Sequence, residues 1–146
     1  MQNDKTKPVL LFTQEQFATY WPQVEPLLAS APVAEEFSPS DILEAALAGQ
    51  MFVYVFARET DEGDVVELAM VFTITPSKKF PVVTIVTVAG KNLKQHASDF
   101  WEHFKGWCVM SGARAIDAYV PERIEGFVEQ LGLKKETVHV RLRLQS

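Results

Sequence analysis

The sequence contains a single cysteine, Cys108, and this scarcity excludes an internal disulfide framework. Because Cys108 stands in the apolar string WCVM of a predicted helix, we interpret it as a small buried residue rather than a nucleophile. Apolar runs of about 18 residues, the length that spans a membrane, are also absent, and the first residues, MQNDKTKPVLLF, offer no export segment. We therefore expect no membrane association and a protein that stays where it is made.

Basic residues are also fewer than acidic ones. Lys and Arg number 14 against 19 Asp and Glu, which gives a formal net charge of -5. Since the basic residues are also scattered, we expect neither a broad basic surface for nucleic acid nor a nucleic-acid partner, and the sequence leaves open only a local basic patch. With 47% hydrophobic and 23% charged residues over 146 positions, the composition is typical of one folded domain.

Helix and strand signals alternate regularly along the chain. Thr13 and Gln16 form a capping box before an amphipathic segment, 13–30, which Pro22 and Pro26 are expected to kink or to split. The other predicted helices cover residues 38–49, a segment that begins a few residues after Gly90 and ends at SGAR (111–114), and residues 121–132. The predicted strands cover residues 7–12, 51–58, 65–75, 81–89, 115–120 and 136–144.

The connections decide how these strands pair. The three strands between residues 51 and 89 are joined by links too short for a helical crossover, so they are expected to form an antiparallel meander. They are apolar on both sides, which favours helices on both faces of the sheet. The sequence therefore predicts one α/β (α+β) domain over residues 1–146, a mixed, mostly antiparallel sheet flanked by about four helices in the order β-α-α-β-β-β-α-β-α-β.

That order resembles the GCN5-related N-acetyltransferase (GNAT) family over nearly the whole chain. One local match is FVEQLGL (127–133), similar to the family's helix-to-strand signature, with Leu133 at the position of its phenylalanine. The chain is more similar still to the small GNAT-like proteins of tailed bacteriophages. Their motifs are matched at Trp21, Val24, Pro26, Leu27, Ser38, Pro39, Asp41, Ile42, Leu47, Gly49, residues 88–90, Trp107, Cys108, residues 111–114, and from Arg123 to Gly132.

The resemblance implies an acetyl-CoA site at TIVTVAGKNLKQHASDFWEHF (84–104), where the sequence departs from the family pattern. The family holds the cofactor's pyrophosphate in a loop of the type Arg/Gln-x-x-Gly-x-Gly/Ala, at a helix N-terminus. The segment AGKNLKQHAS (89–98) lacks these glycines, so Gly90 is interpreted as a turn residue. Lys91, Lys94 and His96 lie near the same helix start and leave open a weaker anion site of different construction, with solvated residues around a turn as the alternative.

If the chain is an enzyme, the resemblance implies that backbone of the fourth strand pairs with the pantetheine arm of acetyl-CoA and that the following turn contacts the phosphates. The pantetheine residues are Val86, Thr87 and Val88, and the phosphate residues are Gly90, Lys91 and Asn92.

The resemblance also implies a general acid and its partner, a tyrosine and an asparagine, and both are missing here. Val128 and Pro121 stand at those positions. Tyr119 is the nearest replacement donor, with a structural tyrosine as the alternative. The candidates for a general base are Glu67, flanked by apolar residues on the third strand, and Asp117 on the fifth, with the solvent face of a strand as the alternative for both.

Three functions remain open. The first is a non-catalytic, phage-type GNAT-like protein that docks on a virion or host protein and needs no cofactor. The second is an acetyl-CoA-dependent N-acyltransferase with a remodelled cofactor loop. The third is a phage inhibitor of a host factor. The expected location is the host cytoplasm or the virion, the expected partner is a protein, and no metal site is expected.

Overall fold

The computed structural model describes residues 6–31, 37–76, 79–90, 93–118 and 125–135, together with Val140, Leu142 and Leu144. The elements follow one another as β1 (Thr6–Leu11), α1 (Gln14–Ala29), α2 (Pro39–Leu47), β2 (Phe52–Thr60), β3 (Gly63–Thr75), β4 (Val82–Gly90), α3 (Leu93–Met110), β5 (Ala115–Ala118) and α4 (Glu125–Gln130). This order confirms the predicted elements from the first strand to the fourth helix.

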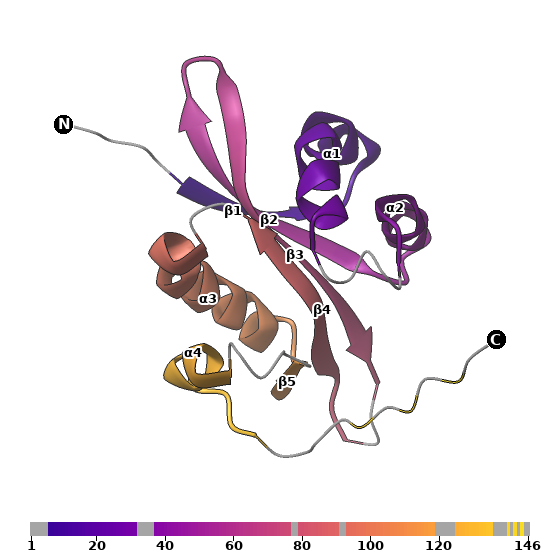
Figure 1. Cartoon of the computed structure of the whole chain (residues 1–146), viewed down its shortest axis with the longest axis vertical. Helices are drawn as coiled ribbons and strands as arrows, with labels where there is room; N and C mark the ends of the chain where they lie inside the picture. Colours follow the sequence, from indigo (N-terminus) through magenta and orange to yellow (C-terminus); the bar gives the residue numbers. More distant parts are fainter. Residues whose placement is uncertain are drawn as a thin grey trace.

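The strands form one five-stranded sheet in the order β1-β2-β3-β4-β5. Strands β1 to β4 pair antiparallel with their neighbours, and β5 pairs parallel to β4, so the sheet is mixed as expected. Figure 1 shows α1 and α2 on one side of the sheet and α3 and α4 on the other. The apolar character of both faces of β2 and β3 follows from this double cover.

Each face of the sheet has its own core. On the α1 side, α1 buries Phe17, Tyr20, Trp21, Val24 and Leu28 against the sheet. On the α3 side the core is largely aromatic: the ring of Tyr54 lies 5.6 Å from Phe100 and 5.3 Å from Phe104, centroid to centroid. These tilted and edge-on contacts add to the burial of apolar area. Alternate residues of β2, β3 and β4 supply the two cores in turn, as the pleat of a strand requires.

The capping box predicted at the start of the first helix is confirmed. Thr13 and Gln16 form a reciprocal capping box at α1, and Ser38 and Asp41 form one at α2. Of the two outcomes predicted at Pro22 and Pro26, a kink or a split, the split is wrong, because α1 continues through both prolines as one element. Each proline removes one backbone hydrogen bond, and the buried face of α1 holds the helix together across the gaps.

Two predicted elements near the C-terminus extend beyond what the structure describes. The fifth strand is described as far as Ala118 and α4 from Glu125 onward, so residues 119–124 of the predicted strand and helix lie outside the described residues. Most of the predicted closing strand, 136–144, also lies outside them. The three residues of it that are described, Val140, Leu142 and Leu144, belong to no strand and are 83–84% exposed.

Cys108 is buried in the α3-side core, as the sequence indicated. Burial raises the pKa of its thiol to about 11, so the sulfur stays protonated at neutral pH and is a poor nucleophile. In the part of the chain that the structure describes, no helix combines the length and the apolar character needed to cross a membrane.

Candidate functional site

Strands β4 and β5 pair over only part of β4. Their register runs from Val82 opposite Ala115 to Ile85 opposite Ala118. Beyond that last pair, no strand among the described residues pairs with the outer edge of β4 from Val86 to Gly90. Backbone N–H and C=O groups on such an edge are the groups with which an extended ligand pairs. We use the name fork for the position at Ile85 and Val86, directly after the last described pair of β4 and β5.

A β-bulge lies next to the fork. On the β3 side of β4, Val71 pairs with Thr87 and Phe72 pairs with Ile85. Val86 is therefore an extra residue that has no pairing partner on β3. The side chain of Val86 packs on the α1-side core. Bulges turn the backbone locally and redirect its polar groups, and they occur often beside binding sites. The three residues predicted to hold pantetheine, Val86, Thr87 and Val88, lie on β4 beyond its last described pair with β5.

Gly90 is not a turn residue, and that interpretation of the sequence was wrong. It is the last residue of β4, it pairs with Leu68, and its φ is not positive. A Cβ built on Gly90 would lie against the carbonyl oxygen of Glu67 and 2.9 Å from the Cα of Leu68. The residue is thus glycine because β3 and β4 approach closely here. Lys91 and Asn92, the other predicted phosphate contacts, lie outside the described residues.

Glu67 is 7% exposed and is the buried charged residue of the described part of the chain. It occupies a bulge in β3, between the pairs that Phe56 and Ala57 form with Leu68 and Val66. Its Oε1 accepts a hydrogen bond from Nε of Arg58 at 2.8 Å, within an ion pair. Arg58 therefore engages one carboxylate oxygen of Glu67, and this oxygen is not free to accept a proton from a substrate. Sequence analysis overlooked Arg58, because nothing local marks it as the partner of Glu67.

Asp117, the other predicted base, is exposed on β5 and pairs with Thr84 of β4. Thr84 pairs in turn with Thr73 of β3. Asp117 therefore stands in a line of polar side chains that crosses three strands, one residue pair before the fork. Sequence analysis identified neither threonine, since only the strand register brings them together. Tyr119, the predicted general acid, lies outside the described residues.

The α3 side of the site is closed by a contact to α4. The indole Nε1 of Trp101 donates a hydrogen bond to the carbonyl oxygen of Leu131 at 2.9 Å, just after α4 ends. Leu131 and Leu133 pack against the α3-side core. These contacts hold the C-terminal end of α4 against the α3-side core.

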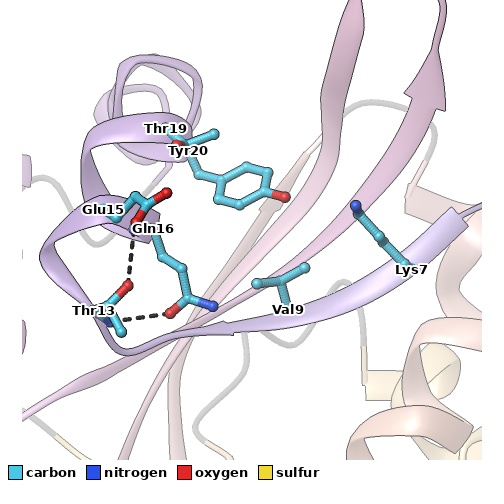
Figure 2. A pocket seen from close by; sticks show the side chains of 7 residues that line it. All are labelled: Lys7, Val9, Thr13, Glu15, Gln16, Thr19 and Tyr20. Carbon is cyan, nitrogen blue, oxygen red and sulfur yellow. Dashed lines mark hydrogen bonds between the residues drawn. The ribbon is translucent and has the colours of Figure 1, made fainter.

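An open pocket of about 470 Å³ lies away from the fork, between α1 and β1. Figure 2 shows Tyr20 reaching from α1 toward Lys7, with Val9 beneath. The Tyr20 hydroxyl donates to Asp64 at 2.7 Å, and Nζ of Lys7 lies 3.1 Å from the same carboxylate. The network joins α1 and β1 to the start of β3, and we interpret it as structural.

This network has a consequence for acid stability. The hydrogen bond from Tyr20, aided by the one from Lys7, lowers the pKa of Asp64 below its ordinary 3.8 despite some desolvation. A depressed pKa in the folded state contributes stability above the unfolded value, and this contribution is lost as the pH falls through the folded value. We expect Asp64→Asn to lower the free energy of unfolding by less than about 1 kcal/mol at pH 7, because the group is largely solvated.

Urea unfolding at pH 7 and at pH 3 checks this expectation. The difference between wild type and Asp64→Asn should shrink at the lower pH. Asp61→Asn, the same change in the adjoining turn, serves as the control. A difference that stays constant between the two pH values would contradict the assignment.

The described residues hold no group of three or more His, Cys, Asp or Glu side chains arranged to bind a metal ion. The donor set around the fork consists instead of backbone groups, hydroxyls and one carboxylate. Such a set suits an extended organic ligand better than an ion.

Comparison with known proteins identifies the fold. No protein-family model matches the sequence, and no curated protein matches it either. Solved structures do match along almost the whole chain: the glucosamine-6-phosphate N-acetyltransferase of Arabidopsis thaliana is 13% identical, with a TM-score of 0.69 over 97% of this chain and 99% of that one. A GNAT family acetyltransferase of Staphylococcus aureus is 12% identical, with a TM-score of 0.67 over 95% and 98%.

An aminoglycoside N-acetyltransferase in complex with CoA is also 12% identical, with a TM-score of 0.65 over 99% of this chain and 98% of that one. The chain therefore has the fold of the GNAT acetyltransferases, as its order of elements predicted. At these identities the likeness concerns the fold, and the activity has to be argued from the site.

Proposed function

We propose that this chain binds an acyl-CoA thioester, acetyl-CoA in the first instance, along the outer edge of β4 and transfers its acyl group to an amine. The observation that carries the proposal is the β-bulge at Val86, which directly follows the last described pair of β4 and β5, Ile85 with Ala118. A bulge redirects the backbone polar groups of its strand, and such groups can pair with the pantetheine arm. The predicted pantetheine residues, Val86, Thr87 and Val88, begin at this bulge.

The direction of the ligand follows from the two ends of this edge. Gly90 leads toward α3, whose N-terminal end favours the phosphates, while Val86 adjoins the fork. The thioester end would therefore lie at the fork, with Val86, Thr87 and Val88 pairing with the amides of pantetheine. Lys91 and Asn92 would contact the phosphates, as the sequence resemblance implied.

The transfer forms a C–N bond to the acyl carbon and breaks the C–S bond, so an amine proton must leave and the thiolate must be protonated. Tyr119 is the proposed donor to the leaving sulfur. Glu67 remains a candidate acceptor of the amine proton, although its ion pair with Arg58 engages one of its oxygens.

Calorimetric titration with acetyl-CoA tests binding, and amide hydrogen exchange locates it. We expect micromolar affinity and slower exchange at Val86, Thr87 and Val88 in the presence of the ligand. Strand β1 is the matched internal control, because it forms the opposite edge of the sheet and should not respond. Absence of heat at millimolar acetyl-CoA would reject the proposal.

A non-catalytic docking protein of the phage type is the second candidate. It is supported by the sequence resemblance, by the missing glycines of the pyrophosphate loop, and by the engagement of Glu67 with Arg58. This candidate predicts no acetyl-CoA binding, so the same titration separates the two. Its partner would be a virion or host protein, which co-purification from infected or uninfected host cells would distinguish.

A further inference from the structure

Three polar side chains project from the α1 side of the sheet in one line across β3, β4 and β5. Thr73 pairs with Thr84, and Thr84 pairs with Asp117. Their neighbours along each strand pack into the opposite, α3-side core: Phe72, Val83, Ile85, Ile116 and Ala118. Because successive side chains of a strand alternate between faces, these three residues must share the α1 side. We call them the polar row.

The polar row is accessible. Thr73 and Thr84 are half-buried and Asp117 is exposed, so solvent or a ligand reaches all three. Asp117 makes no ion pair with any other described residue. A carboxylate accepts hydrogen bonds and does not donate them, and a threonine hydroxyl can accept as well as donate. The row thus presents a negative charge beside further acceptors, a combination that fits a primary ammonium group.

The position of the row relative to the fork gives a distance. Thr84 precedes Val86 by two residues, and Val86 faces the same α1 side as the row. Two residues of a strand span about 7 Å. The proposed function places the thioester of the ligand beside Val86. A cation bound to Asp117, which lies opposite Thr84, is therefore about 7 Å from the thioester along the strand. A nitrogen bound to Asp117 is therefore too far away to attack the thioester carbon beside Val86.

We propose that the acceptor is a dibasic amine, in which one ammonium group binds to the polar row at Asp117 and a second nitrogen, about 7 Å away, receives the acyl group. This inference rests on the proposed acyl transfer at the fork. Asp117 is then a positioning residue for the acceptor instead of the general base. The ammonium at Asp117 keeps its protons, while the second nitrogen loses one as it forms its bond to the acyl carbon.

Two amines of equal length test the inference. Putrescine carries an amine at both ends of a four-carbon chain, and butylamine carries one. With acetyl-CoA as donor, we expect kcat/KM for putrescine to exceed that for butylamine at least tenfold in the wild-type protein. In Asp117→Asn the ratio should fall to near one. Asp99→Asn, which removes an exposed carboxylate from α3, should keep the wild-type ratio.

The outcomes separate the possible roles of Asp117. If Asp117 is the general base, Asp117→Asn lowers both rates by the same factor and leaves the ratio unchanged, which overturns the inference. Equal rates for the two amines in the wild type also overturn it. If acetyl-CoA binds but neither amine is acetylated, the inference fails while the binding proposal stands. If acetyl-CoA does not bind, the proposed function itself fails.

Discussion

Arg58→Met is expected to lower the free energy of unfolding by about 3–5 kcal/mol. Glu67 is 7% exposed, and its Oε1 lies 2.8 Å from Nε of Arg58. Methionine retains much of the apolar stem of arginine but removes the guanidinium, so the variant leaves a carboxylate buried without its partner. The desolvation penalty of that carboxylate is then no longer offset by its ion pair. Urea unfolding at pH 7 measures the loss.

Two further variants show whether the loss arises from the unpaired charge. Lys105→Met removes the exposed ion pair between Lys105 and Glu102 on α3, and we expect a change below about 1 kcal/mol. In Arg58→Met/Glu67→Leu both charges are absent, so much of the lost stability should return. A double variant as unstable as Arg58→Met alone would show that packing of Arg58, rather than the charge of Glu67, accounts for the effect.

Gly90→Ala is expected to lower the free energy of unfolding by about 2–3 kcal/mol. The added Cβ would meet the backbone of β3, at the carbonyl oxygen of Glu67 and the Cα of Leu68. Backbone atoms in a paired strand cannot move aside as a flexible side chain can. The variant must therefore push the end of β4 away from β3, at the point where the chain leaves the sheet toward α3.

Gly106→Ala provides the matched control for this prediction. Gly106 lies in α3 and an added Cβ there meets no atom within 4 Å. Alanine has a higher helix propensity than glycine, so this variant should gain about 0.5–1 kcal/mol. Thermal or urea unfolding of both variants gives opposite signs if the interpretation is right. Equal stability of Gly90→Ala and the wild type would show that β4 tolerates displacement at this end.

The sequence predicted well wherever a local pattern carries the information. The capping box predicted at Thr13 involves residues three positions apart, and it is present in the structure. Burial of Cys108 followed from its apolar neighbours in a helix. The exception among local predictions is α1, where Pro22 and Pro26 argued for a kink or a split, and the helix is not split. Contacts between its buried face and the sheet, which no local pattern contains, outweighed the proline effect.

The residues at the site were predicted less completely. Val86, Thr87 and Val88 lie on β4 beyond its last described pair with β5, and their role in binding pantetheine stays a prediction. Asp117 lies on β5 opposite Thr84. Gly90, in contrast, was assigned to a turn because a glycine after a β-branched run is commonly one. Its proximity to Leu68, 22 positions earlier in the chain, depends on the pairing of β3 with β4.

The sequence by itself determined the order and type of the elements, their capping residues and the membership of one fold, because each follows from periodicity or from residues a few positions apart. Only the tertiary structure decided that β4 has a bulge at Val86, that Arg58 neutralises Glu67, and that Thr73, Thr84 and Asp117 form one row. These features depend on strand register. A shift of one residue would turn each side chain to the other face, and no local pattern specifies the register between strands.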